Sequence, residues 1–267
     1  MKKHVIIPIF ISHRGCPNDC VFCNQKKITA RDGDVTPEDV SKTVETWLTT
    51  LHDLAPSEIE LAFFGGSFTG LPLSEQEAFL EIAKGYKEAG RIGKIHLSTR
   101  PDYISPQILD NLKRYGVDVI ELGVQSFDDA DLSVCGRAHH AADAVNFFTA
   151  ARKAKFENIS FDLMYGIPGQ TLQTVVNNIN TAIHLEPEHI SLYGLKVEEG
   201  TPFWFDRHEL AFPDEETERS MYFTSVGLLE QAGYHQYEIS NFAKRGYSCR
   251  HNLKYWNCDE YIGFGPA

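Results

Sequence analysis

Residues 16–23 read Cys16-Pro17-Asn18-Asp19-Cys20-Val21-Phe22-Cys23, which places three cysteines at the spacing CxxxCxxC. Three thiolates this close together in one loop can hold a single inorganic centre. A structural zinc site takes four protein ligands, a cubane iron–sulfur cluster usually takes four cysteines, and no fourth Cys or His follows within a few residues. A cluster held by three cysteines leaves one iron open, so the loop predicts a catalytic cluster. A zinc knuckle and three buried thiols stay open as alternatives.

Regular elements surround this loop. A β-branched run from Val5 to Ile11 leads into it and predicts the first strand. Further strands are expected at 59–64, 94–99, 117–124, 159–164 and 190–197. Helices are expected at 40–54, 74–90, 105–115, 128–134, 141–155, 172–185 and 214–232, with a capping box at Ser74-x-x-Glu77. Strands that alternate with helices predict parallel β/α units with right-handed crossovers. The predicted class is α/β, a partial (β/α)6 barrel of the TIM type with a small C-terminal extension.

Barrels of this kind place their chemistry at the C-terminal ends of the strands. The cysteine loop, Gly65-Gly66, Gln125 and Gly166 all follow a predicted strand. Two adjacent glycines let backbone groups approach a ligand closely, and a tight turn would explain them equally well. The sequence therefore predicts one site at this end of the barrel.

The composition is that of an ordinary soluble globular protein. The chain has 267 residues, of which 42% are hydrophobic and 23% are charged. The sequence contains no run of 18 apolar residues, so it predicts no membrane span. Since the N-terminus also lacks a small-residue cleavage site, we expect a cytoplasmic protein. The net charge of −12 argues against nucleic acid as a partner, because such binding needs a basic surface. We expect Cys249 and Cys258 to be buried thiols.

The spacing CxxxCxxC, with Phe22 before its last cysteine, resembles the signature of the radical S-adenosylmethionine (SAM) enzymes. In that superfamily the open iron binds the amino and carboxylate groups of SAM, and one electron cleaves SAM to a 5′-deoxyadenosyl radical. The resemblance implies a 4Fe-4S cluster on Cys16, Cys20 and Cys23, with SAM as the cofactor. It also implies an electron donor protein such as flavodoxin or ferredoxin, and a partial barrel of six β/α units.

The second half of the chain is similar to the oxygen-independent coproporphyrinogen III oxidase family. The similarity lies in residues 123–127, 136–137, 162–171, 189–193, 199–202 and 237–243. The segment His251-Asn252-Leu253-Lys254-Tyr255-Trp256 fits the HNxxYW motif of the haem chaperone branch, HemW. Residues 12–20, 65–68 and 97–102 instead resemble the catalytic subunit of the Elongator tRNA-modifying complex.

The resemblance implies roles for particular residues. His251 is a candidate haem ligand, with Tyr255 and Trp256 packing on the macrocycle, although a hydrogen-bonded core histidine is the alternative. The SAM contacts implied are Phe22 beside the adenine, the loop Gly65, Gly66 and Ser67 at the methionine end, and Gln125, Arg137 and Asp162 along the rest of the molecule. Taken alone, Gln125 could cap a strand end, Arg137 could form a surface ion pair, and Asp162 could be a buried, satisfied carboxylate. No catalytic residue is assigned beyond the cluster.

Three departures bear on the reaction. The oxidase has Tyr where Phe10 stands, a SAM-binding Glu where Ser98 stands, and a fourth Cys where Gln25 stands. They count against decarboxylation, so the resemblance implies a haem chaperone. The oxidase, which converts coproporphyrinogen III to protoporphyrinogen IX, is the alternative, and an RNA-modifying enzyme is the second alternative.

Two parts of the chain are expected to differ in structure. Residues 1–200 are predicted to form the partial barrel, and residues 201–267 to begin the family's C-terminal region. The sequence stops in the glycine-rich stretch Gly263-Phe264-Gly265-Pro266-Ala267, which in the family runs on into a further domain, so the resemblance implies that this is a piece of a longer protein.

Overall fold

The computed structural model describes residues 4–11, 14–16, 20–23 and 35–259. Its centre is one sheet in which neighbouring strands follow the order of the sequence before a final antiparallel pair. The parallel strands are β1 (Val5–Phe10), β2 (Ile59–Phe64), β3 (Lys94–Thr99), β4 (Val119–Gln125), β5 (Asn158–Tyr165) and β6 (His189–Gly194). The strand β8 (Asn241–Ala243) pairs antiparallel with β6, and β7 (His235–Gln236) pairs with β8.

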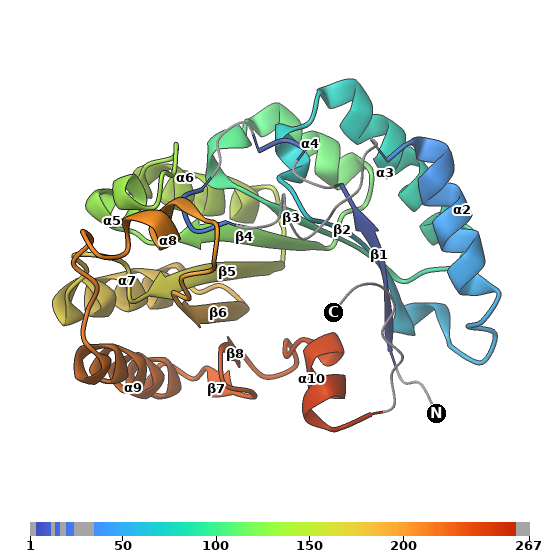
Figure 1. The fold of residues 1–267 in the computed structure, drawn as a ribbon. Helices are drawn as coiled ribbons and strands as arrows, with labels where there is room; N and C mark the ends of the chain where they lie inside the picture. Colours follow the sequence, from blue (N-terminus) through green and yellow to red (C-terminus); the bar gives the residue numbers. More distant parts are fainter. Residues whose placement is uncertain (1–3, 12–13, 17–19, 24–34, 260–267) are drawn as a thin grey trace.

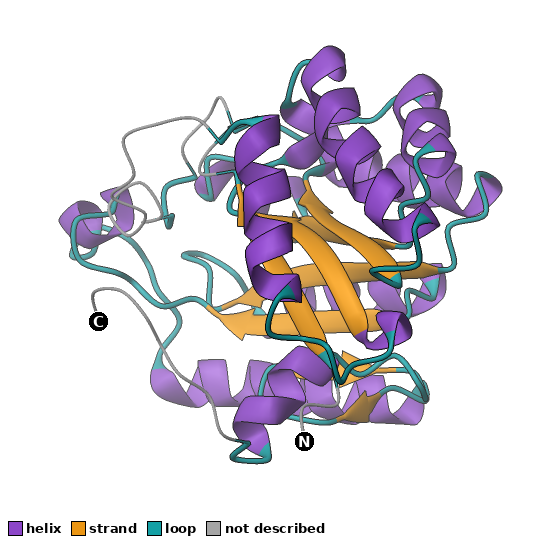
Figure 2. Ribbon diagram, turned by 90° about the vertical axis from the view of Figure 1, so that its right-hand side faces the viewer, coloured by secondary structure: helices purple, strands orange, loops and turns teal. Residues whose placement is uncertain are grey.

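Helices cover the convex side of the curved sheet (Figure 1). They are α2 (Pro37–Leu48), α3 (Leu73–Glu88), α4 (Pro106–Arg114), α5 (Asp129–Val134), α6 (Ala141–Lys153) and α7 (Leu172–Leu185). Three more follow β6: α8 (Pro202–Asp206), α9 (Glu215–Gln231) and α10 (Arg250–Trp256). Figure 2 shows the strands as one layer with helices around it. Because β1 and β7 end the sheet order without pairing with each other, the barrel is open, as predicted.

The alternation of residues along each strand separates the core from the interior of the barrel. Side chains facing the helices are apolar and fully buried, such as Leu61, Leu97, Leu122 and Phe161. The intervening positions face inward and carry polar groups, which include Glu60, His96, Ser98, Glu121 and Asp162. A packed apolar layer therefore supports an interior in which titratable side chains are gathered.

Most predicted elements are confirmed within a few residues, and several details are corrected. Thr36 caps α2 in a reciprocal box with Asp39. The predicted box at Ser74 is wrong: Pro72 occupies the N-cap, α3 begins at Leu73, and no side chain caps it. Since the helix starts before Ser74, that hydroxyl lies within the first turn and cannot act as its cap.

Other boundaries also move. The helix expected to reach residue 54 ends at Leu48, and the strand expected to reach residue 197 ends at Gly194. Neither α8 nor α10 was predicted, because each is too short to show a helical period in the sequence. The split into a barrel and a C-terminal region at about residue 200 stays a prediction.

Candidate functional site

The cysteine loop lies between β1 and α2, at the carboxyl end of the sheet. In its described part Cys16 and Cys20 are half-buried and Cys23 is exposed. Val21 ties the loop to the rest of the barrel: its N–H donates to the carbonyl of Cys135 at 3.2 Å, and its carbonyl accepts from the N–H of Phe203 at 3.3 Å. Main-chain bonds from two distant elements therefore fix the part of the loop that ends in Cys23.

Phe22 is the aromatic residue expected beside the adenine of SAM. Its ring is half-buried against a small apolar cluster formed by Cys135, Met164 and Ile167. These residues come from the end of α5 and from the end of β5 and the loop after it. The contact with adenine stays a prediction, and the apolar setting suits the face of an aromatic base.

The three cysteines do not stand as a preassembled centre. Among the residues that the structure describes, no three His, Cys, Asp or Glu side chains lie close enough together to hold a metal ion. Joint ligation by Cys16, Cys20 and Cys23 therefore stays a prediction. Of the thiols expected to be buried outside the loop, Cys258 is exposed and Cys249 is half-buried, so that expectation was wrong. Both lie in or beside α10, a short helix with no buried residue.

Glycines let the cysteine loop dock on the Gly65-Gly66-Ser67 loop. A Cβ atom on Gly66 would overlap the carbonyl of Arg14, and one on Gly15 would overlap the carbonyl of Ser67. The N–H of Ser67 donates to the carbonyl of Arg14 at 3.1 Å. The glycine pair is thus required by a close approach of the chain to itself. Its contact with the methionine end of SAM is a second, untested role.

Ser67 stands where the family usually has an acidic residue, and its side chain is fully buried. Its Oγ atom lies 3.2 Å from Oγ1 of Thr99 and accepts from the N–H of Arg100 at 3.3 Å. Thr69 adds a further hydroxyl contact to Thr99 at 2.5 Å. This cluster of hydroxyl groups binds the glycine loop to the end of β3, so the side chain of Ser67 already has its partners within the protein.

Two predicted SAM contacts, Gln125 and Arg137, meet at the end of β4. Gln125 has a left-handed backbone with φ of 70° at an irregularity in the pairing with β5. Arg137 donates from Nη1 to Sγ of Cys20 at 3.3 Å and from Nη2 to the carbonyl of Gly123. A Cβ atom on Gly123 would lie 3.3 Å from the amide nitrogen of Gln125 and 3.6 Å from Nη2 of Arg137. The structure thus brings Gln125, Arg137 and Cys20 together, and their contacts with SAM stay a prediction.

Asp162 pairs with Gly123 in the register of β4 and β5 and faces the interior. Burial raises the pKa of its carboxyl group well above the ordinary value, and the negative charge of Glu121 raises it further, against weaker opposition from Ser191 and Arg137. Its Oδ1 atom has no hydrogen-bond partner in the described part of the chain. An unpaired buried oxygen is costly, so Asp162 fits the prediction of a ligand contact at this position.

Glu121 lies beside the position at which the family has its SAM-binding glutamate. Ser98, which occupies that position on β3, pairs with Glu121 in the sheet register and donates to its Oε2 atom at 2.6 Å. The charge of Glu121 also acts on Asp162. Sequence reasoning missed Glu121, although its inward position on a predicted strand could have indicated it.

A second missed group holds the loops around the site. Asp131 is buried, and its Oδ2 atom accepts from Ser126 at 2.7 Å, from Gln170 at 2.6 Å and from Asn178 at 3.4 Å. Gln170 in turn accepts from the N–H of Gly166 at 2.9 Å. One carboxyl group therefore connects the loops after β4 and β5 with α7.

Arg100, at the end of β3, is the third missed residue. Its side chain forms a fork with Asp102, from Nε at 3.1 Å and from Nη2 at 2.9 Å. Burial raises the pKa of the Cys16 thiol, and the positive charge of Arg100 is the largest influence that opposes this rise. A cation beside a thiol favours the thiolate, which is the form that binds metal. Together with Arg137, Arg100 gives the cysteine loop the electrostatic setting that a cluster of thiolate ligands requires.

His251 lies apart from these residues. It belongs to α10, which an ion pair between Arg250 and Glu58 joins to the start of β2. Burial lowers the pKa of His251, as do the charges of Lys254 and His4, and Glu60 at the start of β2 opposes them. The imidazole is therefore neutral at neutral pH. It faces the amino ends of the strands, whereas the cysteine loop lies at their carboxyl ends.

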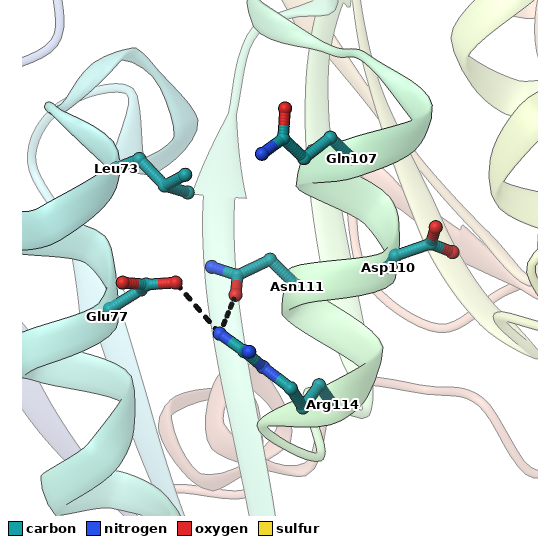
Figure 3. A pocket seen from close by; sticks show the side chains of 6 residues that line it. All are labelled: Leu73, Glu77, Gln107, Asp110, Asn111 and Arg114. Atoms are coloured by element: carbon teal, nitrogen blue, oxygen red, sulfur yellow. Dashed lines mark hydrogen bonds and ion pairs between the residues drawn. The ribbon is translucent and has the colours of Figure 1, made fainter.

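A small pocket of about 220 Å³ lies between α3 and α4. Figure 3 shows Arg114 at its edge, donating to Glu77 at 2.8 Å and to Asn111 at 2.7 Å. None of the predicted site residues lines it. This pocket, on the helical side of the sheet, is separate from the site at the strand ends. No helix in the described part of the chain is long and apolar enough to cross a membrane.

Comparison with known proteins gives the family. The sequence pattern of the Radical SAM superfamily matches residues 10–182. The chain is 37% identical over 259 residues to the haem chaperone HemW of Bacillus subtilis, and the match covers 94% of this chain and 67% of that protein. The likeness to HemW thus extends into the first hundred residues, where motifs of the Elongator branch also occur.

Solved structures agree on the fold. The coproporphyrinogen III oxidase HemN from Escherichia coli, a radical SAM enzyme, has a TM-score of 0.67 at 17% identity, covering 96% of this chain and 59% of that one. Elp3 from the archaeon Methanocaldococcus infernus has a TM-score of 0.63 at 20% identity, covering 84% of this chain and 54% of that one. The chain therefore spans about two thirds of the B. subtilis relative and less of these structures. From the matched pattern and the identity to HemW, we conclude that this chain belongs to the radical SAM superfamily, in the family of HemW.

Proposed function

We propose that this chain acts as a haem chaperone that binds a 4Fe-4S cluster, SAM and haem. The identity of 37% to HemW over 94% of the chain is the observation that carries the proposal. Membership in the radical SAM family implies the cluster and SAM. We propose haem as a ligand because the relative is named a haem chaperone and because residues 251–256 fit the HNxxYW motif.

At the strand ends, Cys16, Cys20 and Cys23 hold the cluster in this proposal. With both bound, the cluster would supply the single electron that cleaves SAM. Arg137 keeps Cys20 in its ligating position through the bond of 3.3 Å to Sγ. Asp162 binds a hydroxyl group of the ribose, Gln125 contacts another part of SAM away from the methionine end, and the main chain of Gly65-Gly66 orients the methionine end.

His251 is the proposed haem ligand. Its lowered pKa leaves a neutral imidazole, which is the form that binds iron. Nδ1 has no hydrogen-bond partner in the described part of the chain, and Nε2 has only a long contact of 3.4 Å with the hydroxyl of Tyr255. The exposed side chains of Tyr255 and Trp256 offer aromatic surface to a macrocycle. This placement keeps haem away from the cluster, as a chaperone that does not modify haem requires.

The oxidase is the second candidate, favoured by the fold shared with HemN. Phe10, Ser98 and Gln25 stand where the oxidase has Tyr, Glu and Cys, which counts against it. Of these, Gln25 lies outside the described residues. RNA modification finds less support, because a net charge of −12 opposes binding of a polyanion.

The remaining parts of the proposal concern the setting of the protein. We place it in the cytoplasm, with a flavodoxin or ferredoxin as electron donor, and treat residues 1–200 as the barrel and 201–267 as a separate C-terminal region. Cell fractionation and affinity capture with a reduced flavodoxin test the first two points.

Haem transfer tests the proposed function. The anaerobically purified protein is titrated with haem, followed by absorbance, and then mixed with an apo-haem protein. We expect one haem per chain and delivery to the acceptor, both lost in His251→Ala and retained in the control His208→Ala, whose side chain is exposed. Haem binding that is equal in the two variants would overturn the role of His251, and no binding by the unaltered protein would overturn the chaperone function.

A further inference from the structure

The short helix α10, which carries His251, has little apolar packing to hold it in place. None of its residues is buried, and an isolated helix of this length is marginal in water. The ion pair between Arg250 and Glu58 joins it to the start of β2, but both side chains are partly exposed, and such pairs contribute little to stability. A further contact is therefore needed to fix the position of this helix.

Tyr237, directly after β7, provides such a contact. Burial and the charge of Cys249 raise the pKa of its hydroxyl group, whereas hydrogen bonds with the main chain of Cys249 and the side chain of Asn252 lower it. A hydrogen bond lowers the pKa of a hydroxyl group when it is donated to the oxygen, because it stabilises the anion. The oxygen of Tyr237 therefore accepts one bond from the residue before α10 and one from the first turn of α10.

The same hydroxyl group is bonded to the sheet. It lies 2.7 Å from Nε2 of His189, and Nδ1 of that ring lies 2.8 Å from Oγ of Ser160. His189 and Ser160 are both buried and pair with each other in the register of β5 and β6. A chain of hydrogen bonds thus runs from α10 through Tyr237 into the sheet.

The donors of this chain all point the same way. Burial, with a smaller contribution from the charge of His96, lowers the pKa of His189 to about 4, so the ring is neutral and one nitrogen donates while the other accepts. Since the oxygen of Tyr237 accepts from α10, its own proton is donated to Nε2 of His189, and Nδ1–H is donated to Ser160. The hydroxyl group of Tyr237 is therefore the link between the helix and the sheet.

The bond from Asn252 also fixes the rotation of α10. Successive residues of an α-helix are turned by about 100° around its axis, so a fixed side chain at Asn252 sets the direction of the preceding one, His251. The ring of His251 in turn packs edge-on against the ring of Tyr255, with the centroids 5.2 Å apart. The contact with Tyr237 thus acts on the direction of the His251 imidazole.

We propose that Tyr237 is a positioning residue of the haem site, which holds α10 through Asn252 so that His251 is directed toward haem. This inference rests on the proposed function, in which His251 is the haem ligand. Tyr237 acts through the helix and needs no contact with haem. Asn252, the second residue of the HNxxYW segment, then binds the protein and not the ligand.

The spectrum of bound haem tests the proposal. Haem affinity and the electron paramagnetic resonance of ferric haem are measured on the anaerobically purified full chain, on Tyr237→Phe and on the control Tyr234→Phe. Each substitution removes one hydroxyl group, and that of the buried Tyr234 donates to the carbonyl of Pro187, between α7 and β6, at 2.7 Å. We expect about tenfold weaker haem binding in Tyr237→Phe, with altered resonances of the iron. The control should match the unaltered protein in both.

A double-mutant cycle separates the action on α10 from a general loss of structure. Asn252→Ala should weaken haem binding by a similar factor. The variant with both Tyr237→Phe and Asn252→Ala should bind haem no more weakly than either single variant, because both substitutions break the same link. Additive effects of the two substitutions, or equal losses of affinity in Tyr237→Phe and Tyr234→Phe, would overturn the proposal.

Hydrogen exchange of the haem-free protein tests the positioning without haem. We expect the amides of residues 250–256 to exchange about tenfold faster in Tyr237→Phe and Asn252→Ala than in Tyr234→Phe, and unchanged exchange would overturn the role of Tyr237. Absence of haem binding by the unaltered protein would reject the proposed function, while the exchange would still decide whether Tyr237 holds α10. If Tyr237→Phe does not fold, Asn252→Ala decides by the same criterion.

Discussion

Nη1 of Arg137 donates to Sγ of Cys20 at 3.3 Å, across 117 positions of the sequence. The bond joins the segment between α5 and α6 to the cysteine loop. The same guanidinium group donates to the carbonyl of Gly123 at the end of β4. Arg137 therefore links Cys20, a proposed cluster ligand, to β4, which pairs with the strand β5 that carries Asp162.

Replacing Arg137 should change the electronic properties of the cluster. Hydrogen bonds to sulfur and nearby positive charge raise the reduction potential of iron–sulfur clusters, so Arg137→Gln should lower it. A redox titration followed by electron paramagnetic resonance measures the potential. We expect full iron and sulfide content in the variant, no shift in the surface control Arg219→Gln, and SAM affinity about tenfold lower in Arg137→Gln. An unchanged potential would contradict this role.

Gly66→Ala tests the docking of the two loops. The new Cβ atom would overlap the carbonyl of Arg14, and overpacking of this kind costs about 1–3 kcal/mol. Chemical denaturation should show this loss, with reduced iron content after reconstitution. Gly85→Ala is the matched control, because nothing lies within 4 Å of its Cβ position in α3. That variant should be more stable by about 0.5–1 kcal/mol. Equal stability of the two variants would refute the close approach.

The buried position of His189 predicts that the folded protein loses stability in acid. It is buried between the hydroxyls of Ser160, at 2.8 Å, and Tyr237, at 2.7 Å. Burial, with a smaller contribution from the charge of His96, lowers its pKa from 6.5 to about 4. Because the pKa of His189 is lower in the folded protein, its contribution to stability is fully present above 6.5, the pKa in the unfolded chain. That contribution is lost as the pH falls through about 4, the pKa in the folded protein.

The free energy of unfolding, measured from pH 7.5 to 4.5, should fall with decreasing pH. The shift corresponds to roughly 3 kcal/mol for complete titration. His189→Gln cannot titrate, so its curve should be flatter while its stability at neutral pH is lower. Parallel curves for the two proteins would show that His189 does not carry the effect.

Asp162→Asn should separate stability from binding. Because the carboxyl pKa of Asp162 is higher in the folded protein, its contribution to stability is fully present below 3.8, the pKa in the unfolded chain. That contribution is lost as the pH rises toward the pKa in the folded protein. Asn does not ionise, so the variant should gain stability over the unaltered protein as pH increases from 4 to 8. Its SAM affinity should fall. The control Asp110→Asn, at an exposed residue, should change neither quantity, and a variant less stable at pH 8 would contradict the account.

The regular elements could be predicted because burial imposes clear periods on them. The strand Lys94–Thr99 and the helix Leu172–Leu185 were predicted with their observed bounds. The location of the cysteine loop and Gln125 at one end of the sheet followed from the rule that parallel strands end at one edge, whereas Arg137, between α5 and α6, was indicated by the resemblance alone. By contrast, α10 lacks any buried residue, so no apolar period could indicate it.

Other parts of the site could not be read from the sequence. Arg100 is a buried cation whose fork with Asp102 and main-chain bond to Ser67 only the structure reveals. Ser67 occupies a position expected to face a ligand, yet its hydroxyl is bonded to Thr99 and Arg100. Both depend on contacts between β3 and the loop after β2, which residue spacing does not encode.

Anaerobic turnover tests the central claim most directly. The cluster-loaded protein receives reductant, SAM and coproporphyrinogen III, and 5′-deoxyadenosine and protoporphyrinogen IX are quantified alongside the Cys20→Ala variant. We predict slow formation of 5′-deoxyadenosine that Cys20→Ala abolishes, and no protoporphyrinogen IX. Formation of protoporphyrinogen IX in proportion to the SAM consumed would identify an oxidase and contradict the proposal of a haem chaperone.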